Sequence, residues 1–520
     1  MKVYQGNIIT CDSKNNTYKF LVEDKGKIIF LGNILPEEFK NVHQEKLNDH
    51  ALLPAFADTH MHFSSFALFS STLDIRNASS HDEICELIND YNHAHNENFI
   101  MGFGASAHNV KEKSLITRKK LDSVCPNKPV MIVKYDGHAS IINTCLINEL
   151  PEKIKKLRGF NYESGEMNQE AFFAVTSYMT KKFSVIRLIK SMLRGIDRLA
   201  EKGIGLIHTA EGVGFPGDLD VDMVRFLSRG QRNAFSTRVF FQTMDVEKVL
   251  KRKLPRIGGC FATALDGCFG SEDAALLEPY SNNPANKGVL YYEDKHVKDF
   301  AIAANRAGLQ IEMHAIGDAA FVQAVDAIEA ALKDFPRSDH RHTIIHACLP
   351  TEEGLEKMAK LGIEIALQPA FLDWTLEPLD YLERILGKRA YKISPLRHML
   401  NLGIHMSGGS DAPCTLPDPI DGIYNACNHY VPEESLTIPE ALRMFTYESA
   451  RMSFDEKERG SLETGKIADM TILNKNPLEL KPAELKSLKV ERLILSGKDY
   501  KKGQGLGSLI VNGIIGTNKI

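Results

Sequence analysis

The chain has 520 residues, of which 43% are hydrophobic, and its 63 basic and 67 acidic residues leave a formal net charge of −4. Because charges of both signs are spread along the chain, nothing indicates the segregated basic face that binds nucleic acid or an anionic membrane. The hydrophobic content allows a large core and about two to four domains. No apolar run reaches the roughly 18 residues of a membrane-spanning helix and no signal-peptide pattern is present, so we expect a cytoplasmic protein without nucleic-acid or membrane partners.

The nine cysteines are odd in number and scattered, and none forms a CxxC pair. A disulfide framework or a zinc finger with cysteine ligands is therefore not expected, and a reducing compartment is indicated. We interpret the cysteines as small buried hydrophobic residues.

The two ends of the chain carry similar patterns. The first fifty residues alternate short apolar runs with turns, as in VYQGNIIT, YKFLVED and IIFLGN, which predicts a small antiparallel sheet. Further apolar runs close the chain at Met470–Leu473, Val490–Ser496 and Ser508–Val511. Because neither end can bury a sheet face alone, we expect one small β-sandwich domain made from residues 1–55 and 456–520.

Residues 56–455 alternate short apolar segments with amphipathic helical patterns such as Asp318–Phe335. Nearly uniform apolar strands, each followed by a helix, predict an α/β fold, a closed (β/α)8 TIM-type barrel with insertions. The candidate strands are the segment ending at His62 and Val130–Asp136, Gly203–Glu211, Arg238–Thr243, Gly259–Gly267, Leu309–Ala315, His342–Ala347, Ile363–Pro369 and Ile404–Asp411. This count is at least one too many for eight, so some of these strands belong to insertions. A long polar stretch, Gly270–Tyr292, is typical of a loop or lid.

The most informative short segment is DTHMH, which contains His60 and His62. In a strand these two side chains share one face, so at a strand end they can bind one metal ion together. Two other HxH pairs, His93–His95 and His340–His342, lie in polar stretches, and we interpret them as solvated. The pair at His60 and His62 ends an apolar run instead, which favours a place at a mouth of the barrel.

Three later strand ends carry similar side chains. One predicted strand ends at His314, another at His346, and a third at Asp411. Since the carboxyl ends of barrel strands meet at one mouth, where barrel active sites form, these residues are expected to converge with His60 and His62.

Several motifs together resemble the amidohydrolase superfamily. They are HMH, HAIGDAA, the strand ending in His346, GGSDAP, GSLETGKIADMTIL, Asp136-Gly137-His138, Asp266-Gly267 and Gln368-Pro369. More narrowly they resemble its YtcJ-like branch, also called amidohydrolase family 3, which includes N-substituted formamide deformylase. The likeness covers nearly the whole chain.

The resemblance implies a metal-dependent hydrolase of a carbon–nitrogen bond other than a peptide bond, in an amide or N-acyl compound. His60, His62, His314 and His346 would be metal ligands, and Asp411 would be both a ligand and the general base. Such a site binds zinc or a similar ion and produces hydroxide at neutral pH. His346 or His138 would hold the oxyanion of the intermediate.

One departure from the resemblance concerns the number of ions. Many relatives carry a lysine that is carboxylated and bridges two metals, but the corresponding stretch, Phe261–Asp266, has no lysine, so a carboxylated lysine is not expected. Either one ion is bound by His60, His62, His314 and Asp411, or Glu211 supplies the bridging carboxylate.

Two further functions are compatible with the same residues. The chemistry also suits a deaminase of an amidine or heterocycle, and a non-catalytic barrel scaffold is a third candidate. The substrate would be a small molecule whose identity lies in loops, and a homodimer is a common outcome for such enzymes.

Overall fold

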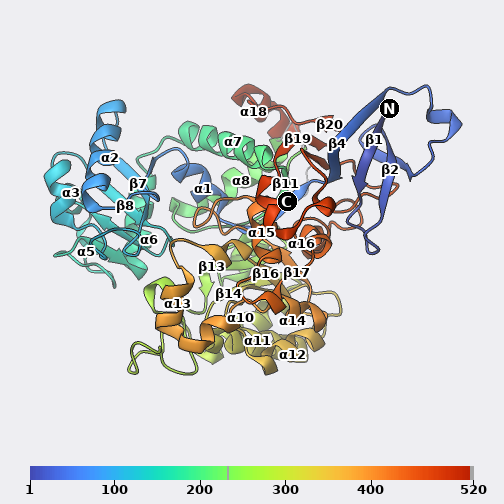
Figure 1. Ribbon diagram of the computed structural model, residues 1–520. Helices are drawn as coiled ribbons and strands as arrows, with labels where there is room; N and C mark the ends of the chain where they lie inside the picture. Colours follow the sequence, from blue (N-terminus) through green and yellow to red (C-terminus); the bar gives the residue numbers. More distant parts are fainter. Residues whose placement is uncertain (231–233, 516–519) are drawn as a thin grey trace.

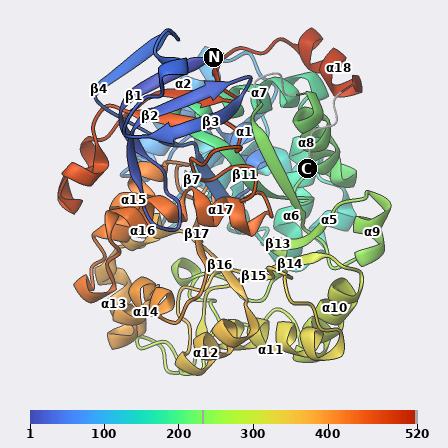
Figure 2. The same ribbon diagram turned by 90° about the vertical axis from the view of Figure 1, so that its right-hand side faces the viewer.

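An eight-stranded parallel barrel forms the centre of the molecule (Figures 1 and 2). The computed structural model describes residues 1–230, 234–515 and 520. Each strand pairs in parallel with the next one along the chain, which confirms the predicted TIM-type architecture. The strands are β5 (Phe56–Met61), β11 (Ile204–Glu211), β12 (Ser236–Phe241), β13 (Arg256–Ala264), β14 (Gln310–Ala315), β15 (Thr343–His346), β16 (Glu364–Leu367) and β17 (Met406–Gly408).

Amphipathic helices cover the barrel on the outside. In α11 (Asp318–Asp334), the residues Phe321, Val325 and Ile328 are buried at the three-and-four spacing that the sequence shows. The other long outer helices are α7 (Val185–Glu201), α8 (Leu219–Gly230), α10 (Asp294–Arg306) and α12 (Glu352–Leu361). Since both faces of the sheet are covered, the strands are buried nearly along their whole length.

The barrel closes where its last strand meets its first. Beyond β17, the Asp411 amide donates a hydrogen bond of 2.7 Å to the His60 carbonyl, and the His62 amide donates one of 2.8 Å to the Ala412 carbonyl. Closure of the barrel therefore places His60 and His62, at the carboxyl end of the first strand, beside Asp411, which follows the last.

A second sheet is inserted between β5 and β11. Its five strands are ordered β10-β9-β8-β7-β6 and have a hydrophobic cluster of their own. They are β6 (Leu73–Asp74), β7 (Ile100–Ala105), β8 (Val130–Lys134), β9 (Ala139–Ile142) and β10 (Glu166–Asn168). The candidate strand at Val130–Asp136 is thus β8, which accounts for the excess over eight, and the turn between β8 and β9 carries the Asp136-Gly137-His138 motif.

The two ends of the chain form one seven-stranded sheet, ordered β20-β19-β18-β4-β1-β2-β3, as the sequence predicted. Its strands are β1 (Lys2–Ile9), β2 (Thr17–Asp24), β3 (Lys27–Gly32), β4 (Gln44–Pro54), β18 (Met470–Leu473), β19 (Val490–Leu495) and β20 (Lys498–Asp499). β4 joins the halves, because it pairs with β1 on one side and with β18 on the other. The sheet folds over a shared core, and Lys27 pairs with Ile467 across the fold.

One terminal prediction was wrong. Ser508–Val511, predicted as a strand, lies in helix α18 (Leu506–Ile515), which packs on α8. Leu509 is fully buried while Ile510 and Val511 are 52% and 60% exposed, so burial does not alternate as in a strand. A short apolar run has no periodicity that distinguishes strand from helix, and here the packing partner is a helix.

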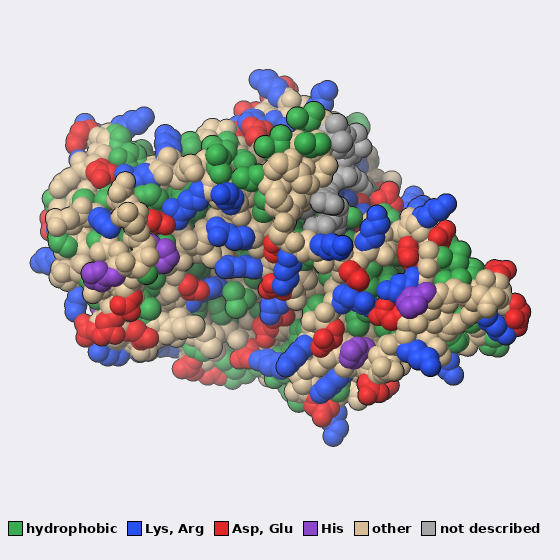
Figure 3. All heavy atoms as spheres, turned by 90° about the horizontal axis from the view of Figure 1, so that it is seen from above, with side chains coloured by type: hydrophobic (Ala, Val, Ile, Leu, Met, Phe, Trp, Pro, Cys, Tyr) green, Lys and Arg blue, Asp and Glu red, His purple; other side chains and the backbone are tan. Residues whose placement is uncertain are grey.

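On the face in Figure 3, acidic and basic side chains are interspersed. Among the described helices, none is both long and apolar enough to cross a bilayer. All nine cysteines are free thiols, and six of them, including Cys260, are buried.

Candidate active site

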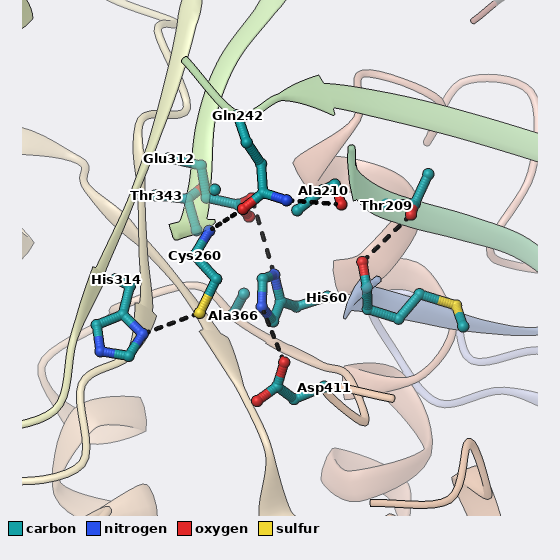
Figure 4. Close-up of polar contacts among 12 residues, drawn as sticks. His60, Thr209, Ala210, Gln242, Cys260, Glu312, His314, Thr343, Ala366 and Asp411 are labelled. Atoms are coloured by element: carbon teal, nitrogen blue, oxygen red, sulfur yellow. Dashed lines mark hydrogen bonds and ion pairs between the residues drawn. The ribbon is translucent and has the colours of Figure 1, made fainter. Parts of the chain in front are cut away.

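Six side chains meet at the carboxyl-terminal mouth of the barrel, four imidazoles, one carboxylate and one thiol. We call them the mouth cluster: His60, His62, Cys260, His314, His346 and Asp411. Figure 4 shows four of them, His60, Cys260, His314 and Asp411. All six are buried, and they come from β5, β13, β14, β15 and the segment after β17. Five of the six were predicted as ligands from their places at strand ends, and the structure brings those five together.

The ligand atoms of the mouth cluster fall into two sets. His60 Nε2 and His62 Nε2 each lie 3.3 Å from Asp411 Oδ1. Cys260 Sγ lies 3.0 Å from His314 Nδ1 and 3.7 Å from His346 Nε2. Within each set the potential ligand atoms lie within 4.8 Å of one another, and the Cys260 sulfur belongs to both.

These residues fit a divalent metal ion. His60 Nε2 and Asp411 Oδ1 are buried and have no hydrogen-bond partner, although they face each other. Leaving such atoms unsatisfied costs about 1–3 kcal/mol each, more for charged groups, so they are unusual in a native core without a function. Imidazole nitrogen, carboxylate oxygen and thiolate sulfur are the donors that zinc takes in proteins.

Buried polar groups behind the cluster orient its imidazoles. His346 Nδ1 lies 2.5 Å from Gln368 Oε1, so the amide oxygen accepts from Nδ1–H and leaves Nε2 to face the cluster. Asp266 Oδ1 lies 3.4 Å from His314 Nε2, and Glu312 Oε2 lies 3.9 Å from His60 Nδ1. Such outer partners fix the tautomer and orientation of metal-binding histidines.

Sequence reasoning missed some of these groups. Asp266 was quoted only as part of the Asp266-Gly267 motif, and its contact with His314 was not predicted. Glu312 was not singled out either. Its spacing from His314 was a usable signal, because residues two apart in a strand point to the same face.

The charges of the cluster depend on one another. Burial by itself raises the pKa of Asp411, but the neighbouring imidazoles of His60 and His62 outweigh it and hold the pKa below the ordinary value. Burial by itself lowers the pKa of His62, yet Asp411 raises it to about 9. For Cys260, burial raises the thiol pKa, but His314 and the other imidazoles bring it well below its usual range. Asp411 and Cys260 are thus the two members of the cluster that are shifted toward their anionic forms.

Cys260 is the member of the cluster that sequence reasoning did not find. It was interpreted, with the other cysteines, as a buried packing residue. It is buried, yet its sulfur faces His314 and His346 at hydrogen-bonding distance. The two glycines directly before it, Gly258 and Gly259, were the available signal, since glycine inside a strand marks a bulge or a close approach.

Glu211 lies at the end of β11 with partners of its own. Its carboxylate accepts hydrogen bonds from Thr209 Oγ1 at 2.6 Å and from the Ser64 amide at 3.1 Å. Burial raises its pKa. In the described part of the chain, neither set of candidate ligand atoms includes Glu211.

A pocket opens above the cluster, and His62, His314, His346 and Asp411 are among its lining residues. The inserted sheet contributes Asp136 and His138 to its wall, and the His138 ring centroid lies 6.3 Å from that of His314. Trp374 lines the pocket and stacks on Phe371, with 4.9 Å between the ring centroids. Phe371 in turn stacks on His346, so an aromatic wall adjoins the cluster.

Compared with protein-family models and with known proteins, the sequence is similar to metal-dependent and other hydrolases over most of its length. The amidohydrolase family model matches residues 47–499. The YtcJ protein of Bacillus subtilis is 26% identical over 484 residues, which cover 87% of this chain and 89% of that protein. N-substituted formamide deformylase of Arthrobacter pascens is 23% identical over 549 residues, which cover 96% of this chain and 97% of that enzyme.

A solved structure shares the fold. An uncharacterized metal-dependent hydrolase from Pyrococcus furiosus is 24% identical, and the match covers 92% of this chain and 100% of that one with a TM-score of 0.73. The family match spans most of the chain and includes every residue of the mouth cluster. The chain therefore belongs to the amidohydrolase family.

Proposed function

We propose that the protein is a metal-dependent hydrolase that cleaves a carbon–nitrogen bond other than a peptide bond, in an amide or N-acyl compound. The observation that carries the proposal is the convergence of Asp411 with His60 and His62, at 3.3 Å, beneath the aromatic pocket. Family membership and the likeness to N-substituted formamide deformylase support the bond class.

His60, His62, His314, His346 and Asp411 would hold the metal, and the donor set favours zinc. A divalent ion held there would polarise the substrate carbonyl and lower the pKa of a bound water to about 7. The described residues support this arrangement, because two buried donor atoms in the cluster have no hydrogen-bond partner.

Asp411 is the proposed general base. Its depressed pKa keeps it ionised at neutral pH, and its position beside two imidazoles leaves it at the floor of the pocket. Asp411 takes a proton as water adds to the carbonyl carbon and passes it to the nitrogen as the carbon–nitrogen bond breaks. His138 faces the same space and would donate a hydrogen bond to the developing oxyanion, whereas His346, whose proton lies on Nδ1 toward Gln368, would offer its Nε2 lone pair to the metal instead.

The pocket wall indicates what flanks the scissile bond. Phe261, Phe269, Phe371 and Trp374 line it, and a second pocket on the side of the inserted sheet shares His62 and Phe261 with it. The second pocket adds Phe69, Phe103, Phe172 and Phe173. Such walls bind apolar groups, so an amide with an aromatic or alkyl substituent is the preferred substrate class.

A panel of substrates tests the proposal. The purified protein is supplied with zinc and incubated with N-formyl and N-acetyl benzylamine, and with formamide and acetamide, which lack the benzyl group. A set of nitrogen heterocycles and amidines completes the panel. Release of benzylamine with formate or acetate is expected. Release of ammonia from the heterocycles alone would identify a deaminase instead, and a protein that binds zinc but turns over none of the panel would favour a binding scaffold.

A further inference from the structure

We propose that Cys260 is a metal ligand shared by two divalent ions, one also held by His60, His62 and Asp411 and the other by His314 and His346. The inference rests on the proposed metal-dependent function and deepens it, because it sets the number of ions and names the bridging group. It replaces both arrangements considered from the sequence, a single ion or a bridge through Glu211.

The position of the sulfur carries the inference. Cys260 Sγ is the one atom common to both sets of candidate ligands found in the described residues. It lies 3.0 Å from His314 Nδ1 and 3.7 Å from His346 Nε2, and it stands within 4.8 Å of the ligand atoms of the first set. An atom so placed between two groups of donors contacts an ion in either group, and thiolate sulfur is a strong ligand for zinc.

The backbone is built to place this sulfur. The register of β13 on β14 shifts between Gly259 and Ala264, so Cys260 opens a bulge that turns its side chain into the barrel. Gly258 and Gly259 have φ values of 102° and 140°, a region that residues with side chains rarely adopt. A Cβ on Gly258 would stand 2.0 Å from the Glu312 carbonyl oxygen, so the two strands approach too closely there for another residue.

Gln242, after β12, holds the bulge from behind (Figure 4). Its Oε1 accepts hydrogen bonds from the amides of Cys260 at 3.1 Å and Phe261 at 2.8 Å. Its Nε2 donates to the Ala210 carbonyl at 3.0 Å, which ties the bulge to the second strand. Both bonds on Oε1 fix the direction of the Cys260 side chain without contacting its sulfur.

Glu211, the other candidate for the bridging ligand, has hydrogen-bond partners outside the mouth cluster. Glu211 has one carboxylate oxygen, Oε1, bound by both Thr209 Oγ1 and the Ser64 amide. Its carboxylate also interacts with the buried Asp220. The Cys260 sulfur, in contrast, forms its hydrogen-bonding contacts with imidazoles of the cluster itself.

Metal counting combined with cobalt spectroscopy tests the proposal. The full chain is stripped of metal with a chelator, loaded with Co²⁺, desalted, and analysed for metal per chain and for absorption. The wild-type protein is expected to hold two ions and to show a thiolate-to-cobalt charge-transfer band in the near ultraviolet. Cys260→Ser is expected to lose that band and at least one ion. Cys348→Ala, which removes a buried pocket thiol outside both ligand sets, is expected to keep the band and both ions.

Further outcomes keep the test decisive. Cys260→Asp retains an anion that can bridge, so it is expected to hold two ions without the band, and circular dichroism checks that each variant is folded. A Cys260→Ser protein that keeps two ions and the band would overturn the proposal. A wild-type protein that binds a single ion would overturn the proposal that two ions share Cys260. The thiolate-to-cobalt band would then show whether Cys260 is a ligand of that ion. A wild-type chain that binds no metal would reject the proposed function as well.

Discussion

The mouth cluster and the Lys134–His138 turn face the same pocket but are built differently. The cluster sits at the ends of barrel strands that are buried along their whole length. The turn belongs to the inserted sheet, which has a hydrophobic cluster of its own on one face, while residues such as Met131 and Val133 join the main core. The contrast teaches that the reacting groups depend on closure of the barrel, whereas the opposite wall of the pocket can change with the insertion.

The turn has its own source of rigidity. Lys134 Nζ lies 2.7 Å from Asp136 Oδ2 and 2.5 Å from Ser271 Oγ, and both charged side chains are buried. Burial opposes ionisation of Asp136, but Lys134 outweighs it and lowers the carboxyl pKa to about 2. The Lys134 ammonium also connects the inserted sheet to the segment after β13. Asp136 and Ser271 are not members of the mouth cluster, so we expect that a substitution at Lys134 disturbs the turn and leaves the cluster intact.

The largest effect is expected at the cluster. Asp411→Asn removes the proposed base and is expected to lower kcat by about 10⁴-fold, the upper end for general acid–base catalysis, or roughly 5.4 kcal/mol. The measurement is kcat on the best substrate of the panel, with circular dichroism as the check on folding. Asp334→Asn, which removes an exposed partner of Arg306, is the control and should behave as the wild type. Near wild-type turnover of Asp411→Asn would reject the assignment of the base.

Removing the Lys134–Asp136 ion pair of the turn is expected to lower the stability of the protein and to leave its metal content unchanged. Lys134→Met leaves Asp136 buried without its partner and is expected to lower the free energy of unfolding by about 3–5 kcal/mol. Chemical denaturation measures the loss, and metal analysis is expected to show the wild-type content. Lys182→Met, which breaks the half-exposed pair with Glu149, should cost about 1 kcal/mol or less. Loss of metal from Lys134→Met would show that the two regions are not separable.

A smaller effect on metal binding is expected for Gln242, which supports the Cys260 bulge. Gln242→Leu removes the hydrogen bonds that hold the Cys260 bulge and is expected to weaken Co²⁺ affinity by about 10–100-fold, as for other partners that position metal ligands. Competition with a chelator measures the affinity. Gln323→Leu is the matched control. Gln323 is a buried glutamine of the outer helix α11 that donates hydrogen bonds to the Tyr292 carbonyl and the Asp294 carboxylate. Equal affinities for the two variants would contradict the positioning role.

The smallest effect concerns the pH dependence of stability. Burial raises the pKa of Glu377, which accepts hydrogen bonds from Tyr135 and the Gly270 amide, from 4.5 to about 7. Between these values the folded protein binds the proton more tightly than the unfolded chain, so stability falls as pH rises through this window. Glu377→Gln is expected to lose this decline, which changes the Tm difference across the window by about 1–3 °C. Parallel Tm profiles for the two proteins would contradict it.

Much of the fold and site follows from local pattern. Short, largely apolar segments, each followed by an amphipathic helix, predict a parallel barrel, because only a sheet covered on both faces buries such strands. His60, His62, His314, His346 and Asp411 were identifiable because the carboxyl ends of parallel strands converge at one mouth. The sheet from both termini followed from the same need to bury an apolar face.

Other features depended on packing that no local pattern encodes. Val130–Lys134 has the composition of a barrel strand, and only its neighbours place it in the inserted sheet. Ser508–Val511 is helical because α8 is its partner.

Cys260 shows the limit most clearly. By sequence it is one of nine scattered cysteines, and the alternation of a regular strand would not reveal it. Its sulfur reaches the centre of the cluster because a register shift, two glycines and a hydrogen bond from β13 to Gln242 redirect the backbone. The sequence alone therefore determined which strand ends carry the chemistry, while the tertiary structure decided which atom lies between them, since that position depends on how neighbouring strands meet.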